Sequence, residues 1–288
     1  MKRLLFITYF ALFFLLSFSF YFLFAAGQWE ELKSEHFIIY FTPQNDNFSR
    51  EVLRKAEEYY STIAEDLGYV RYSNFWKWEN RVKIYLYAGH DSYLKATGKP
   101  RWSHGMADYS KKEIVSYVWG RGFLNALLPH ELAHLIFRDF VGFKSDIPLW
   151  LDEGVAQWEE KAMRNMRKDR VVELTRKNKL FSLAEMMRLD VRTSAVESKD
   201  EINSVNFESD RRPQPVKGND VVDIYYLEAF SLVGFLVEQY DPRDFVTFCR
   251  QLRDGKNIDD ALRFAYPASI RNVDDLEKQW KNYITDRR

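Results

Sequence analysis

Two histidines four positions apart constrain this chain more than any other feature. Residues 130–134 read His-Glu-Leu-Ala-His, and apolar residues recur around them at helical spacing, at Leu128, Leu135 and Ile136. Positions i and i+4 lie on one face of a helix about one turn apart, so both imidazoles can reach one metal ion. The segment therefore predicts a helix that is buried along one stripe and carries paired imidazoles on another.

A purely structural role for these histidines is the alternative, in which they only hydrogen-bond to carbonyl groups. Two imidazoles and the Glu131 carboxylate on a buried helix are costly unless they coordinate something, so a metal ion is favoured. Pro129 fits the helix if Asn125 is its N-cap, because backbone donors in the first turn have no helical partners.

A carboxylate 19 residues after His134, that of Glu153, completes a candidate ligand set. This length lets the first helix run to about Asp139, the chain turn at Gly142, and a second helix begin near residues 146–148 and lie antiparallel to the first. Glu153 then returns over the histidines. A catalytic zinc ion takes three protein ligands and keeps one position open, so the expected cofactor is Zn²⁺.

The neighbours of Glu153 leave several roles open. Asp152 is a competing ligand, and Glu153 itself could be a solvated carboxylate at a helix start, although the apolar residues around it favour burial. Gln157 lies one turn later on the same face, where it either orients a ligand or is a surface amide. Gly154 permits the two helices to pack closely.

Strands come first in the remaining pattern and helices follow. The expected elements, in chain order, are a strand at residues 35–41, a helix at 48–67, a strand at 82–87, a hairpin with arms at 106–109 and 114–118, and helices from 125 onward. Three helices close the chain: one that begins at Asp241-Pro242, one at 257–265 and one at 273–284. We divide the chain into an α/β part at 28–192, a polar surface loop at 193–222 and a helical part at 223–288 that closes the cleft.

The first 27 residues are a targeting segment. Residues 4–27 carry no charge and follow Lys2 and Arg3, which places the N-terminus on the cytoplasmic side and the rest of the chain outside. Twenty-four residues can span about 30 Å of hydrocarbon, which favours a membrane anchor, although residues 25–27 also offer a signal-peptide cleavage site. We expect an extracytoplasmic domain, periplasmic or at the cell surface, either anchored or secreted.

Charge excludes some partners. After residue 27 the chain has 40 basic and 42 acidic residues, which gives no electrostatic case for nucleic acid or for an anionic membrane surface. The single cysteine, Cys249, lies in an apolar run and is expected to be a buried hydrophobe. The expected partners are a peptide or protein substrate and a membrane through the N-terminal segment. The sequence carries no signal for an oligomeric state.

Residues 130–134 together with 150–154, Trp-Leu-Asp-Glu-Gly, resemble the gluzincin zinc metallopeptidases, in particular the bacterial peptidase MA-like proteins. The segments at 29–40, 82–87, 105–107 and 226–233 are similar to that family in their order. The resemblance implies an α+β, thermolysin-like fold, in which a mixed sheet, a zinc helix and a glutamate helix precede a helical half. It also implies zinc bound by His130, His134 and Glu153, and peptide-bond hydrolysis.

The mechanism assigns roles to residues that do not bind the metal. Glu131 can accept a proton from the attacking water and pass it to the leaving amine. Family members often use a downstream Tyr or His to stabilise the oxyanion, which makes Tyr226 the candidate and Tyr225 the alternate, although each is equally a core aromatic. A substrate backbone would pair with an exposed strand of the hairpin, at Met106 and Ala107.

The hairpin also predicts an endopeptidase. Gluzincin aminopeptidases carry Gly-x-Met-Glu-Asn, whose glutamate binds the free amine of the substrate, whereas residues 104–108 here read His-Gly-Met-Ala-Asp. Only Asp108 could replace that glutamate. The alternative functions are a catalytically silent peptide-binding or scaffold domain and a zinc hydrolase of another amide, such as a cell-wall peptide.

Overall fold

The computed structural model describes residues 29–69, 76–101, 103–142, 147–189, 191 and 220–286. The predicted targeting segment and most of the predicted loop at 193–222 lie outside these ranges. Among the described helices, none combines the length and apolar character needed to cross a membrane.

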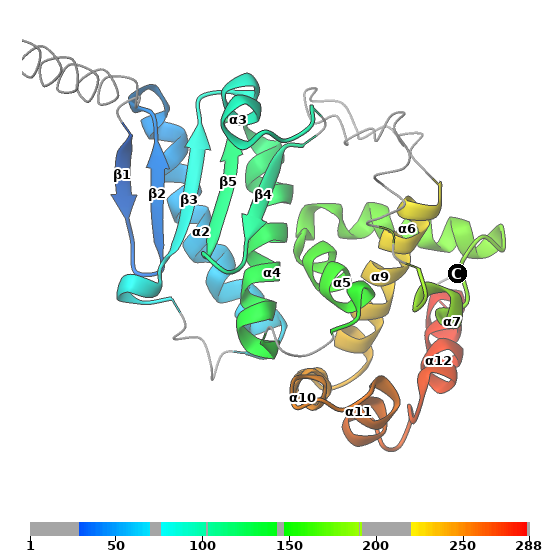
Figure 1. Cartoon of the computed structure of the whole chain (residues 1–288). Helices are drawn as coiled ribbons and strands as arrows, with labels where there is room; N and C mark the ends of the chain where they lie inside the picture. The colour runs from blue at the N-terminus through cyan, green and yellow to red at the C-terminus, as the bar shows by residue number, and fades with distance from the viewer. Residues whose placement is uncertain are drawn as a thin grey trace, which may run out of the picture.

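A five-stranded mixed sheet forms the first half of the fold, in the order β1-β2-β3-β5-β4 (Figure 1). The two edge strands run antiparallel to their neighbours, while the three central strands are parallel. The strands are β1 (Glu30–Lys33), β2 (Phe37–Phe41), β3 (Val82–Tyr87), β4 (Gly105–Asp108) and β5 (Glu113–Tyr117). The predicted α+β class with a mixed sheet is confirmed.

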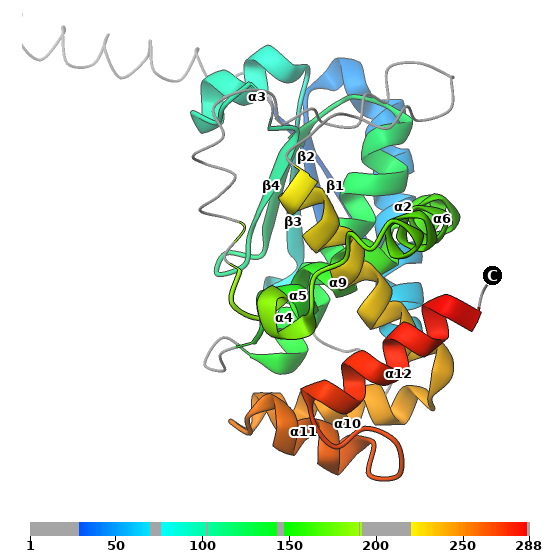
Figure 2. The ribbon, with the colours of Figure 1, turned by 90° about the vertical axis from the view of Figure 1, so that its right-hand side faces the viewer.

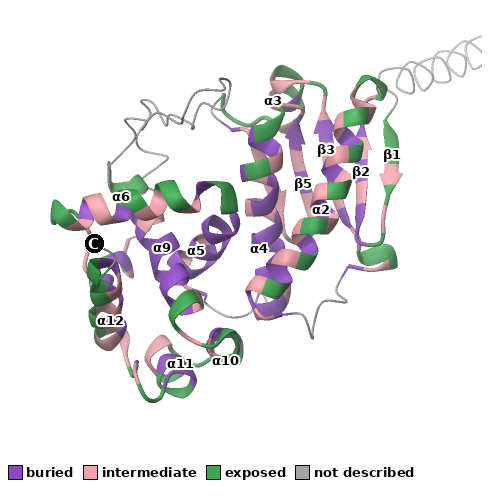
Figure 3. Ribbon diagram, turned by 180° about the vertical axis from the view of Figure 1, so that it is seen from behind, coloured by how far each residue is buried: buried purple, intermediate pink, exposed green. Residues whose placement is uncertain are grey.

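Alternating burial shows that one face of the sheet is covered. Phe37 and Ile39 of β2 are fully buried, whereas Ile38 and Tyr40 between them are partly exposed. The buried face packs against helix α2 (Asp46–Asp66), and α4 (Leu128–Val141) lies beside α2 on the same side (Figures 1 and 3). Period-two alternation in these strands is the pattern expected of a half-covered sheet.

The predicted hairpin joins β4 to β5. The Asp108 carboxylate accepts hydrogen bonds from the backbone N–H groups of Ser110 and Lys111, each 3.1 Å long. Lys112 completes the turn with a φ of 54°. Between β3 and β4 the chain forms a helix that the sequence patterns did not predict, α3 (His90–Thr97).

The prediction that Asn125 is the N-cap of helix α4 is wrong, because the chain is already helical before this residue. A π-helical turn spans Phe123–Leu127 and continues directly into α4. A proline ring clashes with the carbonyl group four residues earlier in a regular helix, and the wider π turn relieves this before Pro129. The predicted end is confirmed, since Gly142 follows α4 with a φ of 78°.

Helices make up the rest of the described chain (Figure 2). They are α5 (Leu149–Glu159), α6 (Arg164–Arg176), α7 (Leu183–Met186), α9 (Asp220–Gln239), α10 (Pro242–Arg253), α11 (Ile258–Ala265) and α12 (Val273–Asp286), with short 3-10 turns at Pro43–Asn45, Trp78–Asn80 and Lys161–Met163. Helix α9 begins at Asp220 and therefore includes the last three residues of the predicted loop.

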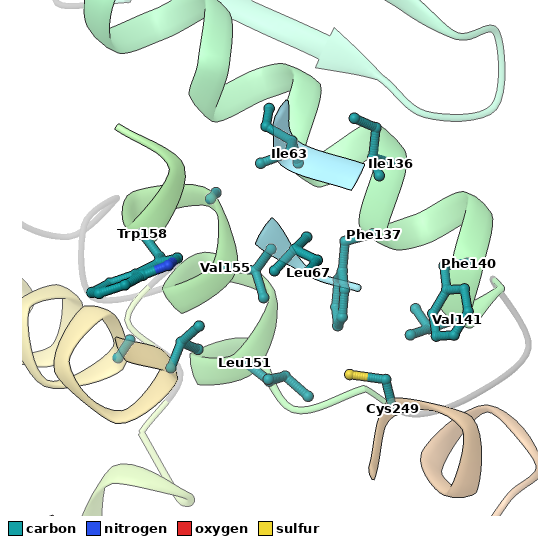
Figure 4. Packing of buried hydrophobic residues seen from close by; sticks show 14 of the residues in the cluster. Ile63, Leu67, Ile136, Phe137, Phe140, Val141, Leu151, Val155, Trp158 and Cys249 are labelled. Atoms are coloured by element: carbon teal, nitrogen blue, oxygen red, sulfur yellow. The ribbon is translucent and has the colours of Figure 1, made fainter. Parts of the chain in front are cut away.

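One hydrophobic core joins the two predicted parts. Its buried residues run from Phe37 in the sheet to Ile284 in α12. Figure 4 shows the region where α2, α4, α5 and α10 meet, with Phe137 between Leu67 and Cys249. Cys249 is fully buried, and burial raises the pKa of its thiol to about 12, so its predicted role as a small hydrophobe is confirmed.

Candidate metal centre

Three potential ligand atoms converge between α4 and α5. Nε2 of His134 lies 3.2 Å from Nε2 of His130, and Oε2 of Glu153 lies 3.6 and 3.9 Å from those two atoms respectively. Tetrahedral zinc with bonds of about 2.0–2.1 Å separates its ligand atoms by about 3.3 Å. The three predicted ligands are therefore placed as a group that could hold a metal ion.

Local sequence explains why Glu153 meets the histidines. Gly142 ends α4 by donating its N–H to the Arg138 carbonyl, 2.8 Å away, and Pro148 is the N-cap residue of α5. Helix α5 then packs against α4. The predicted path of a helix, a turn at Gly142 and a second helix is confirmed.

Gly154 lets another helix pack closely against α5, but this helix is α9, whereas the sequence indicates α4. A Cβ atom added there would lie 2.4 Å from the Ala229 carbonyl oxygen and 2.7 Å from Cγ2 of Val233, both in α9. Adjacent residues on a helix point about 100° apart, so Gly154 faces α9 while Glu153 faces the histidines. Helix α9 therefore packs against the side of α5 that faces away from the histidines.

His134 is held by Asp152 and not only by its position on the helix. Nδ1 of His134 lies 3.0 Å from Oδ1 of Asp152, and the Arg138 guanidinium donates two hydrogen bonds to Oδ2, of 2.6 and 3.1 Å. Burial opposes a charge on His134, but Asp152 and Glu153 outweigh it and hold the pKa of the ring well above its ordinary value. Asp152 therefore orients a candidate ligand, because it holds Nδ1 of His134 while Nε2 faces Glu153.

His130 has an equivalent arrangement. Its Nδ1 lies 2.9 Å from Oε1 of Glu160, and Arg167 donates to Oε2 of Glu160 across 2.8 Å. Burial raises the pKa of Glu160, but Arg167 and His130 outweigh it, so the net shift is downward. Both imidazoles therefore turn Nε2 toward Glu153 because a carboxylate holds Nδ1.

Glu131 occupies the position next to the first histidine on α4. Burial is the largest influence on its carboxyl group and raises its pKa above the ordinary value, although the two histidines lower it. The side chain is partly exposed. The Glu131 carboxyl group therefore lies beside the candidate ligands and binds a proton more tightly than an exposed glutamate does.

Tyr109 is a residue near the centre that the sequence patterns did not single out. Its ring meets the His134 ring edge-on, with centroids 5.8 Å apart. Burial raises the pKa of its phenol, and the charges of Glu131, Asp152 and Glu153 raise it further.

The two tyrosines predicted as oxyanion donors lie on α9, with ring centroids 6.0 Å apart. Tyr225 is almost fully buried, whereas Tyr226 is partly exposed. Both precede Ala229, the residue that contacts Gly154, by about one helical turn. They therefore belong to the helix that supports α5.

The predicted substrate strand is the edge strand β4. Met106 and Ala107 pair with Val115 and Ile114 of β5, and within the described residues β4 has no strand on its other side. A Cβ atom at Gly105 would lie 2.4 Å from Cδ2 of Leu127, so β4 runs directly beside the start of α4. The free edge is thus next to the helix that carries the histidines.

Gln157 is buried in α5, and its backbone carbonyl accepts a 2.7 Å hydrogen bond from Arg167. The contacts to ligand rings that we predicted for its side chain are made by Asp152 and Glu160. Arg138 could have been found from sequence, since it lies four residues after His134 on the same helix face. Glu160 follows the last residue of α5, so helical periodicity does not indicate it.

Comparison with known proteins adds no assignment to this geometry. No protein-family model matches the chain, and none of the curated proteins matches it.

Proposed function

We propose that this protein is an exported, zinc-dependent endopeptidase with a thermolysin-like, gluzincin arrangement. The observation that carries the proposal is the convergence of His130, His134 and Glu153, with both Nδ1 atoms held by carboxylates and with Glu131 alongside. A metal site used only for structure does not need a carboxylate such as that of Glu131, which does not bind the metal.

The donor set fits zinc. Two imidazole nitrogens and one carboxylate oxygen are zinc donors, and three protein ligands leave a fourth position open. Bound zinc at such a site lowers the pKa of a water molecule and polarises a carbonyl group. Asp152 and Glu160 fix the rings of the two histidines, so the ligands are oriented in advance.

Glu131 supplies the proton transfer in this proposal. Its carboxylate accepts the proton of the attacking water and delivers it to the departing amine nitrogen. Burial raises its pKa, which makes it a stronger base than an exposed glutamate. Tyr226 and Tyr109 are the candidate donors to the oxyanion, from α9 and from the end of β4 respectively.

The free edge of β4 would hold an extended substrate by main-chain hydrogen bonds. Asp108, the only acidic group that could replace the aminopeptidase glutamate, is engaged in the hairpin turn by Ser110 and Lys111. The hydrogen bonds from the Ser110 hydroxyl and the Lys111 side chain are the largest causes that lower the pKa of Asp108, to about 2. This supports cleavage within a chain and not at a free N-terminus.

One combined experiment tests the proposal on the full chain. Metal analysis should find about one zinc ion per chain, and a peptide library should be cleaved at internal bonds. His134→Ala should lose stoichiometric zinc. Glu131→Gln should keep zinc and fold while losing roughly 10²–10⁴-fold in rate. Zinc binding without cleavage would favour the scaffold alternative, and full activity of Glu131→Gln would exclude the proton-transfer role.

A further inference from the structure

The face of the sheet opposite α2 and α4 is only partly covered. Strand register places Tyr40, Tyr85, Val115 and Met106 in one row across four strands. All four side chains are partly exposed, and so is Ile38 in the next row. Helix α3 covers one end of this face, where Tyr93 meets Tyr117 with ring centroids 5.8 Å apart. We call the remaining surface the open face (Figure 1).

Aromatic rings dominate the open face. Tyr40 stacks on Tyr85 with ring centroids 4.9 Å apart and an interplanar angle of 13°. Trp29 meets Tyr85 and Tyr87 edge-on, at 6.1 and 5.1 Å, and remains 37% exposed. Side chains with an apolar body and a polar tip gather at protein interfaces and at membrane–water boundaries.

The charged groups on the open face form ion pairs. Lys33 lies 2.6 Å from Glu31 on β1, and Lys83 lies 3.8 Å from Glu113 at the hairpin end. Asp108 pairs with Glu113 across the strands and lies 3.2 Å from Lys111. The other side of the sheet is different. The outer surface of α2 is exposed along much of its length (Figure 3), and it carries a dense set of ion pairs. These pairs join Asp46, Arg50, Glu51, Arg54, Lys55 and Glu58. Of the two sides of the sheet, as the described residues form them, the open face is the one suited to an apolar partner.

The chain itself indicates which partner. The uncharged run at residues 4–27 ends two positions before Trp29, and the Trp29 ring lies on the open face. A run of that length can span a bilayer, and Trp and Tyr are enriched where proteins meet the headgroup region. We propose that the open face lies against the membrane–water interface, with Trp29, Tyr40, Tyr85 and Tyr87 at headgroup level.

This contact would be apolar, because the charges of the face cancel in pairs. It should therefore form on neutral phosphatidylcholine and gain little from anionic lipid. The proposal is independent of metal binding and catalysis, so the inactive variant Glu131→Gln should show the same contact.

Spin labels on the full chain in phosphatidylcholine vesicles test the proposal. Cys249 is fully buried, which leaves the surface free of reactive thiols among the described residues. Ile38→Cys and Val115→Cys place a label on the open face, and Arg54→Cys places the control on α2. Failure of a thiol reagent to modify Cys249 confirms that each variant is folded. Labels at 38 and 115 should be severalfold more accessible to lipid-dissolved oxygen than to an aqueous nickel chelate, and the label at 54 should show the reverse.

Three outcomes would overturn the proposal. The first is aqueous accessibility at 38 and 115 equal to that at 54. The second is protection from both reagents, which would mean that protein covers the face, either a second copy or another segment. The third is a chain that remains in solution when vesicles are present.

Discussion

Oε1 of Glu160 lies 2.9 Å from Nδ1 of His130, although Glu160 is the first residue after helix α5 and belongs to neither helix of the metal centre. Arg167 of α6 holds the other oxygen of the same carboxylate. The orientation of the first histidine therefore depends on a third helix.

Glu160→Gln should weaken zinc binding by about 10–100-fold, because the amide no longer holds the imidazole as a carboxylate does. Competition with a chromophoric chelator measures the affinity. Gln157→Ala is the matched control, since the hydrogen bond of Gln157 to Arg167 uses its backbone carbonyl, which the substitution retains. Equal losses in the two variants would show that Glu160 has no special role.

The sequence predicts that the three candidate ligands converge, because their spacing obeys helix geometry. His130 and His134 share a face at i and i+4, and Gly142 marks the turn that returns Glu153. The groups behind the ligands could not be predicted in the same way. Glu160 lies past a helix end with φ −73° and ψ 67°, a conformation that no periodicity describes.

The fold shows the same division. Short runs rich in branched and aromatic residues predicted β2 and β3, and in the structure each of these strands has one buried face. Strand β1 has no buried residue and helix α3 buries only Tyr93, so neither has a hydrophobic pattern to reveal it. The contact of Gly154 with α9 joins segments 75 residues apart, which only tertiary structure can specify.

Gly154→Ala should destabilise the protein, because the new methyl group meets backbone atoms of α9 at Ala229. Overpacking of this kind costs about 1–3 kcal/mol, which exceeds the gain of about 1 kcal/mol in helix propensity. Urea unfolding measures the change. Gly89→Ala, where no atom lies within 4 Å of the added carbon, should change stability by less than about 1 kcal/mol. A neutral Gly154→Ala would mean that α5 and α9 can separate freely.

Glu159 predicts a dependence of stability on pH. Its side chain is fully buried, neither oxygen has a hydrogen-bond partner, and burial raises its pKa to about 8 although Arg164 lies 3.6 Å away. Between about pH 5 and 8 the native carboxyl keeps a proton that the unfolded one has lost, so the free energy of unfolding falls as pH rises.

Glu159→Gln should remove this contribution and gain about 1–4 kcal/mol over the parent protein on going from pH 5 to pH 8. Urea titrations at several pH values compare the two proteins. The raised pKa of Glu228 contributes equally to both and cancels in the difference. A constant difference across this range would show that Glu159 ionises normally in the folded state.

Acetylation of the substrate separates the two peptidase classes. With Asp108 engaged in the hairpin turn, no carboxylate is assigned to a substrate ammonium group, so matched free and acetylated peptides should be cleaved at similar internal positions and rates. Mass spectrometry of the products makes the comparison. Release of single N-terminal residues, lost on acetylation, would identify an aminopeptidase instead.

The candidate metal centre is formally short of positive charge. Its carboxyl groups are those of Glu131, Asp152, Glu153 and Glu160, and its guanidinium groups are those of Arg138 and Arg167. With all four carboxyl groups ionised, two negative charges remain uncompensated, which is unfavourable in a buried site. One divalent cation restores neutrality, whereas a monovalent ion leaves half of the imbalance. The same excess of negative charge favours the protonated form of His134, which is why the pKa of this ring is raised.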